Sequence, residues 1–199
     1  MSSYSHRVEP STLRLADIAS VRQGHPFRGA IAEVSDGPVR VIQLKNVTAS
    51  GLHEPHALLR TRLRPRKEPE WVRHEDVLLT ARGNRPVAAL LCSPPPDTVC
   101  TPHLYVIRVT STCTVLPAFL AWQLNQPPAQ EQLRRQSAGS RQKSVRKIAV
   151  EQLVLRLPPL AQQRRIVAIA RAAQLECSRL EALIAARRQE IAAVTARLL

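Results

Sequence analysis

The sequence predicts an α+β fold: a mixed α/β domain, residues 1–158, followed by a long C-terminal coiled-coil helix, residues 159–199. Short apolar runs bounded by Gly, Pro and Asp predict strands in the domain. The last 38 residues instead repeat small or aliphatic side chains at a 4-3 spacing, which is typical of a coiled coil. With 199 residues, 44% of them hydrophobic, the chain can bury one core and extend a single helical arm.

Strand-like patterns dominate the first half of the chain. Residues 13–23 predict a short strand, a turn and a second strand, which Gly24 and Pro26 end. Residues 60–70 mix charges with prolines, so a surface connection is expected there. The other predicted strands are residues 39–47, which alternate apolar and polar side chains, residues 76–83, which run into a Gly-Asn turn, and the runs that begin at Ala88 and Leu104.

Helical spacing appears in the second half. Pro117 suits the first turn of a helix, and a helix is predicted from there until Pro127 and Pro128 interrupt it. A second short helix, about residues 129–136, leads into a polar loop. Residues 154–160 predict a final strand, and a Pro-Pro pair separates it from the terminal helix.

The terminal helix carries a continuous seam. At about 1.5 Å per residue it is roughly 55 Å long, so the domain cannot cover all of it, and part of the seam needs a partner helix. Arg187 in the seam costs stability unless it meets water or a carboxylate such as Glu176 or Glu181, and it is a candidate for selecting register. The seam positions are Ile166, Ala170, Ala173, Cys177, Leu180, Ile184, Arg187, Ile191, Val194 and Leu198.

The charge of the chain favours a nucleic-acid partner. The formal net charge is +14, from 29 basic and 15 acidic residues, and only four of the basic residues are lysines. Arginine suits bidentate contacts with phosphates and guanine edges. Residues 1–150 hold 21 of the basic and 11 of the acidic residues, so the domain carries most of the excess. Aromatic residues are few, which disfavours single-strand binding by base stacking and favours duplex DNA.

Motifs for catalysis are missing from the sequence. The spacing of the six glycines matches neither a dinucleotide turn nor a phosphate-binding loop. The string around Asn125 lacks the aromatic residue of an adenine methyltransferase motif. No acidic residue stands two positions before a lysine, as a metal-dependent nuclease would favour. His53 and His56 flank a proline, which opposes helical zinc ligation. We therefore expect no catalytic residue, no metal site and no bound cofactor.

The cysteines and the N-terminus indicate an intracellular protein. Cys92, Cys100, Cys113 and Cys177 form no CxxC pair, and all four are expected to be reduced. The first ten residues lack the apolar stretch of a signal peptide, and no apolar run is long enough to span a membrane. The sequence therefore predicts a cytoplasmic protein with no membrane partner.

Several basic loops are candidates for DNA contact. Residues 134–147 contain six basic residues and no acid, with Gly139 and three serines around the bend. Solvated basic loops and ordinary polar turns remain the alternative interpretation. The candidates are Ser140, Arg141, Gln142 and Lys143 in this segment, Arg82, Asn84 and Arg85 in the turn after residues 76–83, and Arg28, Lys45 and Asn46 in two further loops.

Five strings in this order resemble the specificity subunit of type I restriction-modification systems. They are LADIASVRQG, DVLLTARG, LPAFLAWQLN, AGSRQKSV and LPPLAQQRRIV, the last leading into the heptad helix. The resemblance implies a target-recognition domain that reads one half of a bipartite double-stranded DNA sequence. It also implies that the helix is a spacer that docks a modification subunit, which binds S-adenosylmethionine and methylates adenine. A restriction subunit is a further candidate partner.

The sequence departs from this family in one respect. Family members usually contain two recognition domains and two spacer helices, whereas this sequence contains one of each. It therefore resembles a half-length specificity subunit, which would recover the full arrangement as a homodimer with antiparallel helices. Two alternatives stay open: a stand-alone coiled-coil DNA-binding or regulatory protein without a methyltransferase partner, and an autonomous enzyme.

Overall fold

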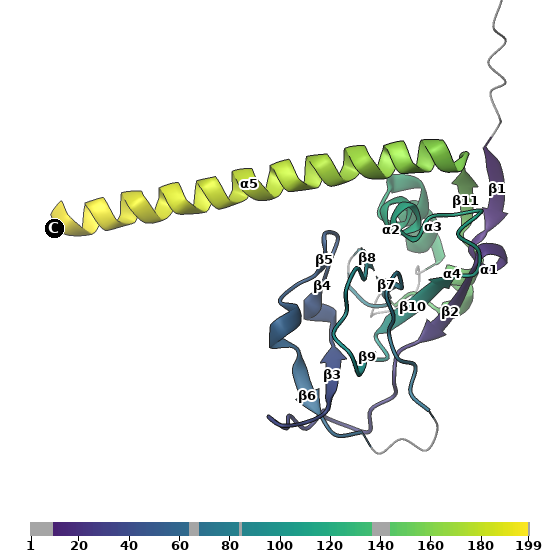
Figure 1. The fold of residues 1–199 in the computed structure, drawn as a ribbon, viewed down its shortest axis with the longest axis horizontal. Coiled ribbons are helices and arrows are strands. Elements are labelled where there is room, and N and C mark those ends of the chain that lie inside the picture. The colour runs from purple at the N-terminus through teal and green to yellow at the C-terminus, as the bar shows by residue number, and fades with distance from the viewer. Residues whose placement is uncertain (1–9, 64–67, 84, 137–143, 199) are drawn as a thin grey trace, which may run out of the picture.

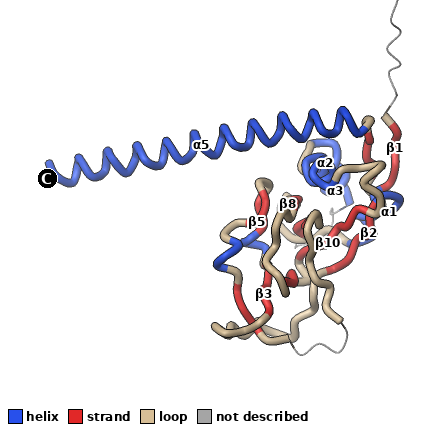
Figure 2. Tube along the Cα trace, in the orientation of Figure 1, coloured by secondary structure: helices blue, strands red, loops and turns tan. Residues whose placement is uncertain are grey.

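The computed structural model describes residues 10–63, 68–83, 85–136 and 144–198. A mixed α/β body lies under one end of a single long helix, α5 (Leu160–Leu198), which continues far beyond the body (Figure 1). Figure 2 shows that strands and loops make up most of the body, with short helices at its edge. This architecture confirms the predicted α+β class and the long terminal helix.

An antiparallel sheet of four strands forms the centre of the body. Its strand order is β2-β10-β7-β8. Ile107 in the middle of β10 lies opposite Val21 on one side and Val77 on the other, and all three are buried. Helix α2 (Pro117–Leu124) packs over β7 and β8 and contributes Phe119, Leu120 and Leu124 to the same core. The strands are β2 (Ala19–Gln23), β7 (Val77–Thr80), β8 (Ala88–Leu90) and β10 (Leu104–Val109).

A second sheet covers the other face of the first. It has the order β6-β3-β9, in which β3 and β9 are parallel. Ile42 and Cys100 of this sheet share a core with Leu78 and Val106 of the central sheet. A small hairpin extends from the second sheet toward α5 (Figure 1). The strands are β3 (Val39–Ile42), β6 (Leu59–Thr61) and β9 (Thr98–Cys100), and the hairpin strands are β4 (Val47–Thr48) and β5 (Gly51–Leu52).

A two-stranded ribbon joins the start of the domain to the start of the long helix. Strand β1 (Ser11–Arg14) pairs antiparallel with β11 (Val154–Leu157), which leads through two prolines into α5. Three short helices complete the body: α1 (Leu15–Ile18), α3 (Pro127–Gln136) and α4 (Lys147–Glu151). The two ends of the domain therefore meet beside the first turn of α5 (Figure 1).

Most of the predicted elements are confirmed, but several differ in extent. The predicted strand 39–47 ends at Ile42, because the side chain of Asn46 accepts a hydrogen bond from the Gln43 backbone N–H at 2.9 Å and closes a short 3-10 helix, Leu44–Asn46. The second short helix begins at Pro127, because a proline needs no hydrogen-bond partner for its nitrogen in the first turn. The elements α1, β5, β6, β9 and α4 were not predicted, and β6 overlaps the surface connection that was expected at residues 60–70.

An ion pair holds the start of β7 in place. Asp76 is fully buried, and its two carboxylate oxygens accept hydrogen bonds from the Arg108 guanidinium at 2.7 and 2.8 Å. The same carboxylate accepts a bond from the Arg73 backbone N–H at 2.7 Å. The hydrogen bond that Arg108 donates to Asp76 is the main cause of the raised pKa of Arg108. The acid at the head of the 76–83 run is therefore a structural residue that joins β7 to β10.

One buried amide anchors α5 to the body. Gln163 is fully buried, and its side-chain oxygen accepts a hydrogen bond from the Leu116 backbone N–H at 2.9 Å. Its amide nitrogen donates to the carbonyl oxygens of Thr114 at 3.0 Å and Pro158 at 2.9 Å. These contacts tie the first turn of α5 to the segment that precedes α2 and to the end of the β1-β11 ribbon.

Beyond this anchor the seam of α5 soon leaves the body. Ile166 is partly buried against the main core, and Ala170 is partly exposed. Farther along, Leu180, Ile184, Ile191 and Val194 are 52–58% exposed. In the described part of the chain, no helix is both long and apolar enough to cross a bilayer. The domain thus leaves the distal seam uncovered, as its length predicted.

Replacing Gln163 with leucine is expected to lower the free energy of unfolding by about 2–4 kcal/mol, because one backbone N–H and two carbonyls would lose their buried partner. The measurement is urea unfolding followed by circular dichroism. Gln162→Leu is the matched control, since the neighbouring side chain is exposed and its replacement should change stability by less than about 0.5 kcal/mol. Equal losses in both variants would contradict the anchoring role.

The four cysteines are free and should differ sharply in reactivity. Burial raises the pKa of Cys100 to about 12, whereas Cys92, Cys113 and Cys177 are exposed. Because the thiolate is the reactive form, the exposed Cys113 should react rapidly with a disulfide reagent at pH 8, and Cys100 only after unfolding. Mass spectrometry of the labelled peptides identifies the protected residue, and rapid labelling of Cys100 in the native protein would be the contrary result.

Candidate nucleic-acid interface

Four strand ends meet at one edge of the central sheet. Strand β2 ends at Gln23 opposite Tyr105, and β7 ends at Thr80 opposite Leu104, so both stop where β10 begins. Strand β8 starts at Ala88, which is paired with Leu79. The antiparallel order therefore gathers at this edge the loops that follow β2 and β7 and the loop that precedes β10.

The edge is closely packed. The Gly24 backbone N–H donates to the Leu104 carbonyl at 2.9 Å, and the His25 N–H donates to the Cys100 carbonyl at 2.7 Å. A Cβ at Gly24 would collide with the Thr101 carbonyl, so only glycine fits at this exit from β2. The Gln23 side chain donates to the Pro102 carbonyl at 3.0 Å. These bonds hold the loop after β2 against the loop between β9 and β10.

The structure places the turn after β7 beside residues 144–145. Arg82 and Ser144 form an antiparallel bridge, and the Val145 N–H donates to the Ala81 carbonyl at 2.9 Å. The hydroxyl of Tyr105 donates to the Val145 carbonyl at 2.8 Å. Burial raises the pKa of Tyr105, and the charge of Glu151 adds to this rise. The far end of the 134–147 segment is therefore fixed beside the turn after β7.

Positive charge at this edge is largely uncompensated. Arg82, Arg85 and Arg146 are exposed, and none of them forms an ion pair within the described residues. Arg85 donates to the Asn125 carbonyl at 3.0 Å, which directs it toward the junction of α2 and α3. Partial burial lowers the pKa of His103, and the charge of Arg82 lowers it further. We call Arg82, Arg85, His103 and Arg146 the basic edge.

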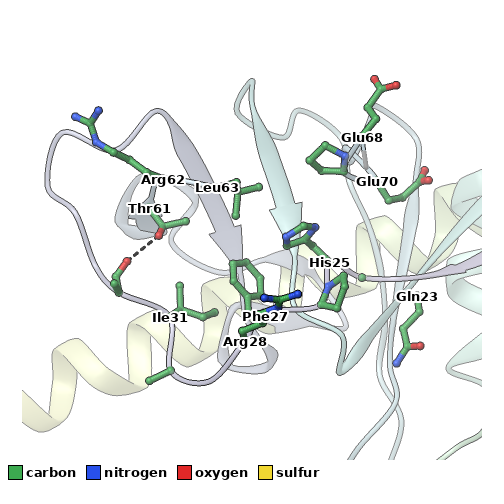
Figure 3. A pocket seen from close by; sticks show the side chains of 15 residues that line it. Gln23, His25, Phe27, Arg28, Ile31, Thr61, Arg62, Leu63, Glu68 and Glu70 are labelled. Atoms are coloured by element: carbon green, nitrogen blue, oxygen red, sulfur yellow. Dashed lines mark hydrogen bonds between the residues drawn. The ribbon is translucent and has the colours of Figure 1, made fainter. Parts of the chain in front are cut away.

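Arg28 lies in the loop that leaves the same end of β2. Together with Phe27 and Ile31 it lines an open cavity of about 720 Å³, which reaches to Arg62 and Glu70 (Figure 3). The carboxylate of Glu70 pairs with Arg22 at 2.6 Å and with Arg108 at 3.1 Å. Arg28 is exposed and belongs to no ion pair in the described ranges. Next to the end of β2 there is therefore a cavity lined by both apolar and charged side chains.

The other predicted residues fall into three groups. Lys45 is exposed on a separate turn after β3, whereas Asn46 is only 6% exposed and its carbonyl oxygen closes that turn. In this position the Asn46 side chain supports the local backbone, and its contact with DNA stays a prediction. The candidates that lie outside the described residues are Asn84, Ser140, Arg141, Gln142 and Lys143.

Part of the basic 134–147 segment is neutralised by an acid that lies just before it. Glu131 pairs with Arg134 at 2.7 Å and with Arg135 at 2.9 Å. These two guanidinium groups lower the pKa of Glu131 to about 2. At the other end of the segment Lys147 pairs with Glu151 at 3.3 Å. Acids that flank the segment therefore compensate three of its six basic residues, because α3 and α4 place each carboxylate about one turn away.

The sequence patterns did not indicate His103 or Gln23 as candidates for DNA contact. His103 stands directly before the strand at Leu104, and Gln23 is the last residue of β2. Residues that end adjacent strands at one sheet edge are neighbours in space, but the pairing of β2 with β10 spans about 80 residues of sequence. The only available signal was their position at strand ends.

No group of three or more His, Cys, Asp and Glu side chains is arranged to hold a metal ion among the described residues. The basic edge consists of three exposed arginines and a half-buried imidazole. Such a set offers hydrogen-bond donors to phosphate oxygens and to the acceptor edges of guanine.

No protein-family model matches the sequence, and no curated protein matches it. Solved structures do match. The type I restriction-modification S subunit from M. genitalium superposes with a TM-score of 0.60 at 10% identity, over 94% of this chain and 45% of that chain. The fold is that of a type I S subunit.

Two further structures support this S-subunit fold. The HsdS subunit from Thermoanaerobacter tengcongensis matches with a TM-score of 0.59 at 15% identity, over 90% of this chain and 40% of that chain. A chain from a structure described as showing complex assembly and conformational transition of the type I R-M system matches with a TM-score of 0.60 at 17% identity. The match covers 89% of this chain and 41% of that chain. This chain therefore spans less than half the length of the S subunits it matches. Identities this low establish a shared fold, whereas function depends on the site.

Replacing Tyr105 with phenylalanine is expected to loosen the bridge between residues 81–82 and 144–145, since the Val145 carbonyl would lose its buried donor. The loss in unfolding free energy should be about 1 kcal/mol. Hydrogen exchange is the measurement. Relative to the unsubstituted protein, the variant should show faster exchange of the Val145 amide, which donates to the Ala81 carbonyl, while exchange of the Ile107 amide in the middle of β10 should stay the same. Unchanged exchange at Val145 would show that the hydroxyl does not hold this segment.

Proposed function

We propose that this chain is a double-stranded DNA recognition subunit of a type I restriction-modification system. Its domain would read one half of a bipartite target, and its helix would position a partner adenine methyltransferase. A restriction subunit is a further partner in systems that cleave DNA. The chain itself would be non-catalytic, and S-adenosylmethionine would bind to the methyltransferase subunit. These roles place the protein in the cytoplasm.

The observation that carries this proposal is the bridge between the turn after β7 and the end of the 134–147 segment. It joins two basic loops at one sheet edge, where Arg82 and Arg146 are exposed and free of ion pairs within the described ranges. Cations at strand ends project from a rigid support, so they can hold one orientation toward a duplex. The fold similarity to S subunits adds the second element, the long helix.

The helix supports the proposed pairing. Its distal seam is apolar and exposed, which a monomer in water would disfavour. Two antiparallel copies would cover both seams and place the two basic edges at opposite ends. The target would then be a palindrome interrupted by a fixed gap.

Methylome sequencing of cells that express the chain together with a candidate methyltransferase tests the proposal directly. The expected result is a palindromic, interrupted motif methylated at adenine. Copurification of the methyltransferase with the chain separates this function from that of a stand-alone coiled-coil DNA-binding protein. A chain that binds DNA but neither retains the enzyme nor directs methylation would fit the stand-alone protein. Methylation or cleavage by the purified chain alone would contradict the non-catalytic assignment.

Arg82→Ala is expected to weaken binding to the selected target. If Arg82 reads a base, affinity for the target should fall by about 1–3 kcal/mol more than affinity for a scrambled duplex. If Arg82 contacts a phosphate, both affinities should fall together, and the slope of log affinity against log salt should decrease by about 1. Fluorescence anisotropy over a salt series measures both effects.

Arg179→Ala is the matched control, because this arginine is exposed on α5 away from the seam positions. It removes the same charge without touching the basic edge. Equal effects of the two variants would show that only the net charge of the protein matters.

A further inference from the structure

The proximal seam of α5 forms one wall of a groove. Ala170, Ala173 and Cys177 line a cavity of about 440 Å³ between α5 and the body. The opposite wall is formed by α2, with Ala118, Ala121 and Trp122, and the hairpin tip at Ala49 and Ser50 closes one side. Most of the apolar side chains along both walls are small, so the groove can admit large side chains from another helix.

The distal half of the same helix has the complementary shape. Its seam positions Ile184, Ile191 and Val194 are large, apolar and more than half exposed. The seam therefore changes from small residues beside the body to large residues beyond it. A helix with this gradient matches a second copy of itself only when the two copies run in opposite directions.

We propose that the groove receives the distal half of α5 from a second copy of this chain, in one register that places Ala173 opposite Ile191 of the second copy. This inference rests on the antiparallel pairing proposed above and adds the docking site and the register. In this register Ala170 faces Val194 of the second copy, and Leu180 faces Ile184. Each small side chain of the groove thus meets a large one.

The register also explains how a cation, Arg187, can occupy a seam position. It places Arg187 opposite Cys177 of the second copy, directly beside Glu176 of that copy. Within its own helix Arg187 already pairs with Glu190 at 2.6 Å. The guanidinium would therefore lie between two carboxylates at the rim of the groove, which offsets the cost of a cation in the seam.

Registers shifted by one heptad lose this match. A shift in one direction puts Arg187 opposite Ala170, next to Arg171, which lines the groove. A shift in the other direction puts Arg187 opposite Ile184, next to the exposed Leu183. The favoured register has one unfavourable contact, because it brings Glu181 of the two copies near the two-fold axis. Size and charge at the other positions outweigh it.

Engineered disulfides test the register, because a disulfide needs Cα atoms about 4.4–6.8 Å apart. In a background with serine at positions 92, 113 and 177, the double variant Ala173→Cys/Ile191→Cys should form a covalent dimer on mild oxidation. Ala173→Cys/Ile184→Cys in the same background reports one heptad shift. Native Cys177 with Val194→Cys, in a background with serine at positions 92 and 113, reports the other. All three variants retain Arg187.

Selective crosslinking of Ala173→Cys/Ile191→Cys, read on a nonreducing gel, is the result expected. Efficient crosslinking of either shifted pair instead would overturn the register, while DNA recognition and pairing would stand. A chain that sediments as a monomer and forms no crosslink would overturn the pairing as well. The methylome and Arg82 experiments remain separate tests of DNA recognition.

A second variant tests the groove itself. Ala173→Trp should fill it and weaken the dimer at least about tenfold in analytical ultracentrifugation. Ala172→Trp is the matched control, since residue 172 is equally exposed but stands outside the seam and the groove lining. It should change the dissociation constant by less than about twofold. Equal weakening by both variants would overturn docking in the groove.

Discussion

The side chain of Gln163 is the contact on which the geometry of the long helix depends. Its three hydrogen bonds reach the segment before α2 and the end of the β1-β11 ribbon, and the side chain is fully buried. A buried amide satisfied on all three sides tolerates little rotation, because each lost bond leaves a polar group without a partner. The direction of α5 relative to the sheet is thus set within its first turn.

That direction places the seam with respect to the basic edge. The proximal seam faces α2 and the hairpin, and the distal seam continues past the body into solvent. The basic edge lies where β2, β7 and β10 meet and is held by the Tyr105 hydroxyl and by the packing at Gly24. At the other end of β7, the Asp76–Arg108 pair prevents that strand from sliding. A rigid body of this kind fixes the position of the basic edge relative to the direction of the helix.

Residues whose role is local were predictable from the sequence. The long terminal helix, the strand after Asp76 and the helix at Pro117 follow from periodicity and from the behaviour of proline, and the structure confirms them. The strand predicted across residues 39–47 was too long, because Asn46 turns the backbone by a hydrogen bond that alternation does not reveal. Asn46 is buried there, whereas the neighbouring candidate Lys45 is exposed. The fold similarity to S subunits agrees with the resemblance that the sequence strings indicated.

The sequence alone determined the fold class, the long helix with its seam, and the concentration of positive charge in the domain, because composition and period are properties of neighbouring residues. Only the tertiary structure decided which charges lie together. It paired residues 81–82 with 144–145, assigned Glu131 to two of the arginines, and buried Asp76 and Gln163 as structural groups. Those outcomes depend on strand pairing and packing between segments far apart in the chain, which no local pattern specifies.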